Sequence, residues 1–116
     1  MKNGMKLSKN DPRIVEKNPR ADVPDVGAVR FEAEVMVWQF ADGRAASAPL
    51  SHWPTLWLAT RAERETFQIN RGAVYWPLLD ADIASEHILS GAREHRALAR
   101  KAWEHWMQRE YASQAA

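Results

Sequence analysis

The chain contains no cysteine, no long apolar run and no glycine-rich phosphate loop. Without cysteine, neither a disulfide framework nor a thiolate zinc site can form, a composition that favours a reducing compartment. No run of about eighteen uncharged apolar residues occurs, and the first residues lack the apolar core of a secretion signal. These absences predict a cytoplasmic protein without a membrane segment.

The sequence also lacks the patterns of common catalytic and metal sites. It shows no internal repeat, no zinc motif and no serine in a nucleophile elbow. Its histidines, at positions 52, 87, 95 and 105, do not have the spacing of metal ligands. We therefore expect a protein that is not an enzyme and that holds no cofactor or metal.

The chain has 116 residues, enough for one domain with one core. Its net charge of +1 hides an uneven distribution, with +4 over residues 1–20, −5 over residues 21–91 and +2 over residues 92–116. Basic ends favour contact with nucleic acid, whereas an acidic centre would repel phosphate. Binding of nucleic acid through the arm and the terminal helix therefore stays an alternative to protein binding.

The first half of the chain predicts a β-meander that follows a basic flexible arm. Residues 1–26 are rich in proline, lysine and asparagine and have few apolar anchors. Strand-forming runs follow at residues 28–32, 35–40 and 44–48, and Met36, Trp38 and Phe40 share one face of the second run. A turn at residues 32–34 and the Asp-Gly pair at residues 42–43 join the three strands.

Helical patterns dominate the remainder. We expect a short helix from Ser51 to Leu58, a second one capped by Thr60 and Glu63 that ends near Phe67, and a long one from Ala92 to Tyr111. Residue 69 joins a further strand. Helical spacing places one apolar stripe on the long helix, formed by Leu98, Ala99, Ala102, Trp103 and Trp106.

The predicted fold class is therefore α+β: a small antiparallel β-meander sheet with short helices packed on it and a longer C-terminal amphipathic helix. The expected organisation is an arm over residues 1–26, the α+β domain over residues 27–91 and the C-terminal helix over residues 92–116.

The stretch from Gly72 to Gly91 predicts a corner that organises the domain. A strand ending at Trp76 is stopped by Pro77, Asp80 and Asp82 follow in a polar elbow, and a helical turn leads to Gly91. In such a loop, carboxylates usually bond backbone N–H groups to shape a turn or cap a helix. A divalent cation would need further oxygen ligands, which are not evident nearby. We expect a structural corner formed by Trp76, Pro77, Asp80 and Asp82, with Arg44 or Arg64 pairing with one of the two carboxylates.

The order of these motifs resembles the bacterial domain of unknown function 2442 (DUF2442) family, over roughly residues 28–91. The shared features are a DGR turn, a proline-leucine pair before an aromatic-proline helix, an arginine before an aromatic residue, and a Trp-Pro-x-x-Asp-x-Asp corner that ends in a Leu-x-Gly helix. The matching positions are Asp42, Gly43, Arg44, Pro49, Leu50, Pro54, Leu56, Ala59, Thr60, Arg64, Phe67, Trp76, Pro77, Asp80, Asp82, Leu89 and Gly91. The chain departs from the family pattern at Ala84, where members usually have serine, so the cap of the helix shifts to Ser85 or falls to Asp82.

The resemblance implies a small α+β domain without an assigned enzymatic activity. Members of such families are often small partner proteins of toxin–antitoxin-like gene pairs, and some carry an appended helix-turn-helix. The first functional hypothesis is therefore a non-catalytic protein-interaction or regulatory module, such as an antitoxin-like protein that binds a basic partner. An enzyme that uses Asp80, Asp82 and His52 is a less favoured hypothesis.

The terminal helix is too long for so small a sheet to cover. Part of the surface formed by Trp103, Trp106 and Met107 is therefore expected to contact another protein or to pair with a second copy of the chain. The expected interaction surface consists of Trp103, Trp106, Met107, His52 and Arg64.

Overall fold

The structure, a computed structural model, describes residues 23–115, so most of the predicted basic arm lies outside the described residues. The end of that arm belongs to the folded body. The Ala41 N–H donates to the Asp25 carbonyl at 2.8 Å, and the Val26 N–H donates to the Arg71 carbonyl at 2.7 Å. The Val26 side chain is buried as well. The folded body therefore begins before the expected domain boundary at residue 27.

The first sheet is the predicted three-stranded meander. Its strands are β1 (Val26–Glu32), β2 (Val35–Phe40) and β3 (Ala45–Pro49), paired antiparallel in the order β1-β2-β3. Met36, Trp38 and Phe40 are buried while Gln39 is exposed, as the alternation along β2 predicts.

Both turns of this meander use left-handed backbone. Ala33 has φ 54° and Gly43 has φ 93°, and glycine reaches this region without the steric cost that a Cβ brings. At the second turn, the Arg44 N–H donates to the Asp42 carboxylate at 3.0 Å and its guanidinium donates at 2.8 Å. These two contacts, the backbone one foremost, hold the pKa of Asp42 below its ordinary value. Arg44 therefore pairs with Asp42, and its predicted pairing with the later aspartates is wrong.

A second sheet replaces the predicted elbow. It consists of β4 (Gln68–Asn70), β5 (Ala73–Trp76) and β6 (Ala81–Ala84), antiparallel in the order β4-β5-β6. The chain reverses after β5 through Asp80, whose φ is 49°. It then returns as a strand that pairs Ile83 with Val74, not directly as a helix. Ile83 is buried and Asp82 is exposed, so this short run alternates as a half-buried strand does.

The short helices differ from prediction at one place. The single helix expected from Ser51 to Leu58 is a 3-10 turn, η2 (Leu50–His52), followed by α2 (Pro54–Trp57). The break falls at Trp53, because a residue before proline avoids helical backbone. α3 (Arg61–Glu65) carries the predicted Thr60–Glu63 capping box, and α4 (Ser85–Ser90) ends at Gly91 with φ 74°.

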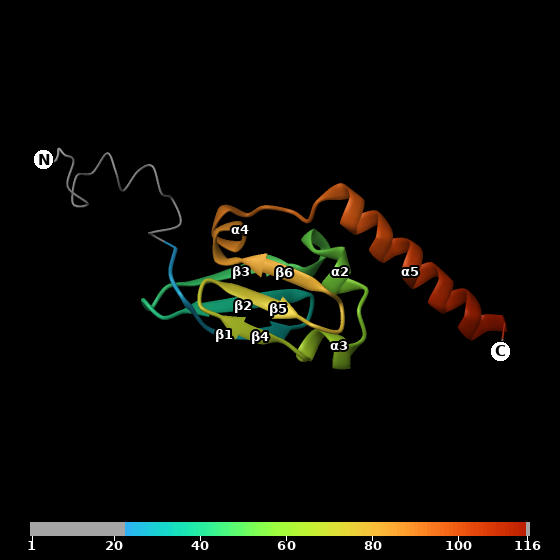
Figure 1. The fold of residues 1–116 in the computed structure, drawn as a ribbon, viewed down its shortest axis with the longest axis horizontal. Coiled ribbons are helices and arrows are strands. Elements are labelled where there is room, and N and C mark those ends of the chain that lie inside the picture. The colour runs from blue at the N-terminus through green and yellow to red at the C-terminus, as the bar shows by residue number, and fades with distance from the viewer. Residues whose placement is uncertain (1–22, 116) are drawn as a thin grey trace, which may run out of the picture.

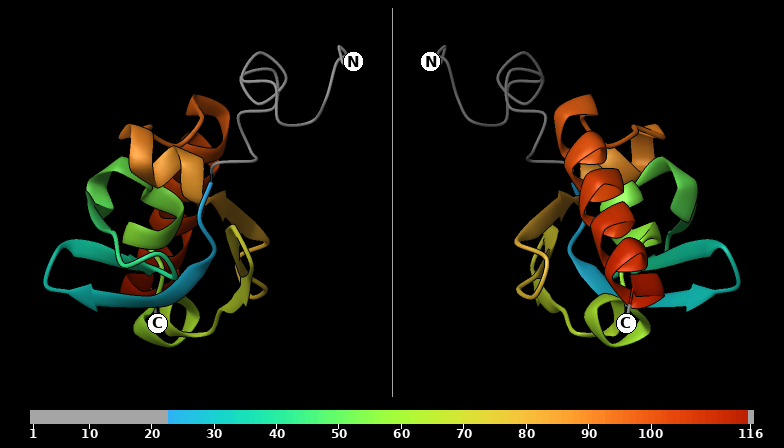
Figure 2. Two further views of the ribbon diagram at one scale, coloured as in Figure 1. Left: turned by 90° about the vertical axis from the view of Figure 1, so that its left-hand side faces the viewer. Right: turned by 90° about the vertical axis from the view of Figure 1, so that its right-hand side faces the viewer.

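The long helix α5 (Arg96–Ala115) begins and ends later than predicted. Residues 92–95 form an irregular link in which Glu94 binds Thr55 of α2. The Ala97 N–H donates to Nδ1 of His95 at 3.1 Å as α5 begins. Figures 1 and 2 show α5 as a separate rod along the outside of the molecule, with α2 between it and the strands.

The core lies between the two sheets and is closed by the short helices. Trp38 and Trp76 are fully buried at its centre, and Nε1 of Trp76 donates to the Arg64 carbonyl at 2.8 Å. Buried aliphatic residues from both sheets and from the helices surround them: Met36, Leu50, Leu56, Val74, Ile83 and Ile88. The predicted α+β class, with an antiparallel β-meander, short helices and a C-terminal helix, is confirmed, and the second sheet adds to it.

Candidate functional site: a groove between the terminal helix and the second sheet

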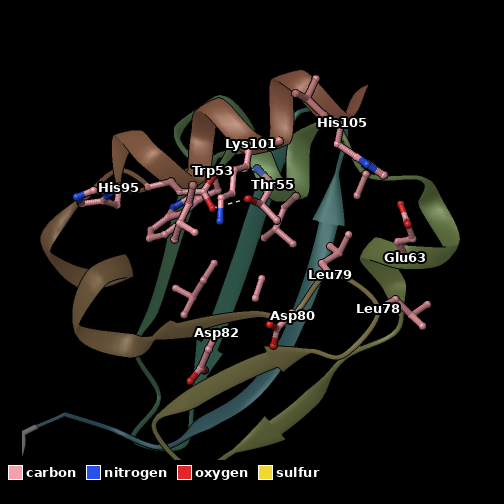
Figure 3. Close-up of a pocket in the computed structure, with 18 of the residues that line it drawn as sticks. Trp53, Thr55, Glu63, Leu78, Leu79, Asp80, Asp82, His95, Lys101 and His105 are labelled. Carbon is pink, nitrogen blue, oxygen red and sulfur yellow. Dashed lines mark hydrogen bonds between the residues drawn. The ribbon is translucent and has the colours of Figure 1, made fainter. Parts of the chain in front are cut away.

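A groove of about 870 Å³ lies between α5 and the turn that joins β5 to β6 (Figure 3). Trp53, Leu56 and Ile83, all buried residues of the core, line its floor. Leu78 from the turn and Leu98 from α5 also line it, and their side chains are 60% and 53% exposed. The groove therefore offers an apolar floor and an exposed leucine on each of two opposite walls.

The corner after Trp76 positions one wall. Pro77 ends β5, and the Leu79 N–H donates to the Trp76 carbonyl at 3.1 Å to close a tight turn. Leu79 packs against the core, which leaves Leu78 pointing outward at the tip of the turn. The turn thus brings Asp80 and Asp82 to the strand side of the groove (Figure 3).

Charges of opposite sign line the two sides. Lys101 and His105 of α5, with His95 just before it, stand opposite Asp80 and Asp82 (Figure 3). All five side chains are exposed. A ligand in this groove would therefore meet Lys101 and two imidazoles along one edge, where the Glu94 carboxylate is already bound to Thr55, and the Asp80 and Asp82 carboxylates along the other.

Glu94 attaches the start of α5 to α2. Its carboxylate accepts the Thr55 N–H at 2.9 Å and the Thr55 hydroxyl at 2.5 Å, and its own N–H donates to the His52 carbonyl at 2.8 Å. The N-cap residue of α2, Trp53, supplies no side-chain cap. Glu94 therefore caps α2 from a distant part of the chain and satisfies an N–H that a helix start leaves without a helical partner.

A second attachment lies further along α5. Nη2 of Arg109 donates to the Leu58 carbonyl at 2.6 Å, and Nη1 lies 3.7 Å from the Glu63 carboxylate. The guanidinium thus satisfies a carbonyl just beyond the end of α2. Together with Glu94 it holds α5 at the distance from the second sheet that leaves the groove open.

An aromatic row closes the contact between α2 and α5. The Trp57 and Trp103 rings meet edge to face with centroids 5.8 Å apart, and Trp103 meets Trp106 in the same way at 5.8 Å. Nε1 of Trp57 donates to the Glu34 carboxylate at 2.8 Å. Trp103 and Trp106 of the long helix therefore make part of their contacts within the chain.

The structure separates the five residues of the expected interaction surface. Trp103 and Met107 remain 39% and 52% exposed on α5, and Trp106 is half-buried beside them. Arg64 instead donates to the Leu56 carbonyl at 3.1 Å and lies over the Phe31 ring. His52 is half-buried, and its backbone carbonyl accepts the Glu94 N–H. The predicted pairing of Arg64 with an aspartate of the corner is therefore wrong.

The two aspartates of the predicted corner have different surroundings. The Asp80 carboxylate accepts the Tyr75 hydroxyl at 3.3 Å across the turn, while Asp82 lies within β6. Neither caps α4, whose N-cap is Ala84 without a side-chain bond. The shift of the cap to Ser85 does not occur either, because the Ser85 hydroxyl is buried and has no hydrogen-bond partner among the described residues.

Sequence reasoning did not find the groove or its attachments. Leu78, Lys101 and Glu94 belong to no motif, and Leu98 appeared only as a member of the apolar stripe; the four residues come together only when α5 docks on α2. The one local signal was the apolar Leu78-Leu79 pair after Pro77, in a segment read as polar. Only one of those leucines packs against the core.

The described residues contain no cluster of histidine and carboxylate side chains that would hold a metal ion. Within the same part of the chain, no helix combines the length and apolar character needed to cross a bilayer.

Comparison with known proteins places the chain in a family. No curated protein matches its sequence. The solution NMR structure of an uncharacterized protein from Chromobacterium violaceum has a similar fold, with a TM-score of 0.59 and 15% sequence identity, over 82% of this chain and 92% of that one. At this identity, the likeness concerns the fold alone. The model of the family described as "Protein of unknown function (DUF2442)" matches residues 26–94, more than half of the chain, so the predicted resemblance is confirmed and the chain belongs to that family.

Proposed function

We propose that this chain is a non-catalytic protein-interaction module that binds an amphipathic segment of another protein in the groove between α5 and the β5–β6 turn. The observation that carries the proposal is the combination of an apolar floor with charged walls of opposite sign. Apolar area supplies most of the free energy of such contacts, while the charges fix orientation and choose the partner.

The walls indicate the chemistry of the partner. Leu78 and Leu98 are exposed on opposite walls, so a segment that lies along the groove could cover both with apolar side chains. Basic residues on one edge of that segment would face Asp80 and Asp82, and acidic residues on the other would face Lys101. A basic partner protein, as in a toxin–antitoxin-like pair, would be attracted to the wall that carries Asp80 and Asp82.

Two observations support a non-catalytic role. The Asp80 carboxylate accepts a hydrogen bond from the Tyr75 hydroxyl across the turn. His52 does not line the groove that contains Asp80 and Asp82 in the described part of the chain. An enzyme that uses these three residues together therefore has little geometric support.

A matched pair of variants tests the proposal. Leu98→Glu places an acid in the groove, whereas Met107→Glu makes the same kind of change at an equally exposed position of α5 outside it. Tagged wild-type chain and both variants are used to capture partners from an extract of the native cell. The captured protein is then purified and titrated against all three by calorimetry.

We expect Leu98→Glu to weaken binding at least tenfold, because an acid would be desolvated against the apolar floor, and Met107→Glu to change it less than twofold. Equal affinities of the three chains for the purified partner would contradict the groove as the binding site. So would selective loss with Met107→Glu alone.

Nucleic-acid binding stays the second candidate because of one observation. Arg93, Arg96, Arg100 and Lys101 are exposed cations close together around the start of α5. Electrophoretic shifts of duplex DNA that weaken steeply with added salt, and that disappear when Arg96 and Arg100 are changed to Gln, would favour this candidate over the first.

A further inference from the structure

A second exposed surface lies on the outer side of α5, away from the groove. Every residue in it is exposed, and successive members are alternately four and three positions apart, the spacing of a helix–helix seam. We call this surface the outer stripe; it consists of Arg96, Arg100, Trp103, Met107, Glu110 and Gln114. It flanks the face that Ala99, Ala102, Trp106 and Arg109 turn toward the body of the domain, where side chains are half-buried. The Trp103 ring also meets Trp57 of α2, so it lies at the boundary between the two faces.

The centre of the outer stripe is apolar and its two ends carry opposite charges. Trp103 and Met107 form the centre and are 39% and 52% exposed. Arg96 and Arg100 lie on the N-terminal side of this centre, and Glu110 lies on the C-terminal side. Tyr111, 75% exposed, adds apolar surface beside the stripe.

The order of these charges opposes the helix dipole. α5 has no acidic residue in its first turn and no basic residue in its last turn. Acids near the start and bases near the end would stabilise an isolated helix, so this arrangement does not contribute to the stability of α5 itself. The same order becomes favourable when a second helix lies alongside in the opposite direction.

We propose that two copies of the chain associate through their α5 helices, antiparallel and related by a two-fold axis that passes near His105. With this register, Trp103 of each copy meets Met107 of the second copy. Arg100 then faces Glu110 of the second copy, and Arg96 faces Gln114. Each of these contacts occurs twice in the dimer, because a two-fold axis repeats it with the two copies exchanged.

The heptad pattern and the charges agree on this register independently. Seam positions are of two kinds: after one kind the next seam residue comes three positions later, and after the other it comes four positions later. In antiparallel helices, each position of the first kind faces a position of the second kind on the partner helix. Arg100 and Glu110 are one such pair, and Met107 and Trp103 are another. The midpoint of both pairs is residue 105, so one two-fold axis serves both. A parallel pair would instead put Arg100 against Arg100 and Glu110 against Glu110, which costs free energy through repulsion. The charge complementarity therefore points to a second copy in the antiparallel orientation.

The position of α5 leaves room for such a partner. The helix runs along the outside of the molecule, and its C-terminal end lies at the edge of the fold (Figure 1). Contact through one helix per copy falls below the size of a standard stable interface, so we expect a reversible dimer with a dissociation constant on the order of 10 µM to 100 µM.

A charge exchange tests the register. Arg100→Glu and Glu110→Arg each replace two intermolecular attractions with two repulsions. We expect either variant to weaken the dimer roughly tenfold or more. In the double variant, and in the heterodimer that forms when the two single variants are mixed, every facing pair again has opposite charges. Association should then return to within about threefold of wild type.

Sedimentation velocity over a range of chain concentrations measures these constants. Arg61→Glu, at a side chain of α3 that is 85% exposed, is the control for charge reversal and should leave the dimer unchanged. The changed residues are exposed, and circular dichroism will verify that all variants fold. A wild-type chain that stays monomeric at about 1 mM would overturn the proposal, as would single variants that show no recovery when mixed.

The two proposals fail separately. Met107→Glu should abolish the dimer and leave groove binding intact, whereas Leu98→Glu should do the reverse. Loss of both functions with Met107→Glu would assign partner binding to the outer stripe and refute the groove.

Discussion

Replacing Glu94 with alanine should loosen α5 from the rest of the domain. The Glu94 carboxylate accepts two hydrogen bonds from Thr55, at 2.9 Å from the backbone N–H and at 2.5 Å from the hydroxyl. A hydrogen bond to a charged group contributes about 1.5–3 kcal/mol. Because the site is only part-buried and water can replace some of the lost contact, we expect Glu94→Ala to lower the free energy of unfolding by about 2 kcal/mol. For a domain of this size, that loss corresponds to a fall in Tm of roughly 8–16 °C.

A double-mutant cycle isolates the contact between the two side chains. Thr55→Val removes the hydroxyl but keeps the backbone N–H, so the coupling free energy with Glu94→Ala should be about 1 kcal/mol. Urea denaturation followed by tryptophan fluorescence measures each corner of the cycle. Glu104→Ala removes an exposed acid from the same helix and serves as the matched control, with an expected change below about 0.5 kcal/mol.

The measured stabilities would refute this reasoning in two ways. If Glu94→Ala cost no more than Glu104→Ala, the carboxylate would not hold α5 against α2. If the coupling with Thr55→Val were zero, the loss would arise elsewhere than in the hydroxyl contact. Amide hydrogen exchange in residues 96–115 should accelerate in Glu94→Ala, because the docking of the helix depends on this link.

Two further predictions concern stability. Ser85→Ala should leave the free energy of unfolding unchanged or raise it by up to about 1 kcal/mol, because the buried hydroxyl lacks a partner among the described residues. If urea denaturation instead showed a loss above about 1 kcal/mol, the hydroxyl would have a hydrogen-bond partner in the folded protein. Asp42 should stabilise the fold above about pH 4, and this contribution should fade as the pH falls through its lowered pKa, because folding favours the charged carboxylate. Denaturation of wild type and Asp42→Asn across pH 2–6 would show the two stabilities converging toward acid, whereas a gap that widens toward low pH would contradict the assignment.

Local chemistry made much of the fold predictable. The Asp-Gly turn at residues 42–43, the Thr60–Glu63 capping box and the apolar face of β2 each depend on residues close in sequence, and each was confirmed. The family followed from the order of such motifs. Patterns of this kind are readable because neighbouring residues determine the backbone there.

The missed features depend on distant contacts. β6 is a strand because it pairs with β5 after the left-handed turn at Asp80, whereas its own sequence has weak strand propensity. The groove exists because Glu94 binds a residue 39 positions earlier and Arg109 binds one 51 positions earlier. Periodicity alone placed Leu98 in the apolar stripe of the long helix, yet the way α5 docks leaves it 53% exposed.

The two meanders also have a kinetic consequence. In each sheet every strand pairs with its sequence neighbour, so pairing closes only short loops. Chains with such local topology cross a low entropic barrier, and we expect the strands to assemble within milliseconds. The slower event should be the arrival of α5, which must bring Glu94 back across the chain to Thr55 after both sheets have formed.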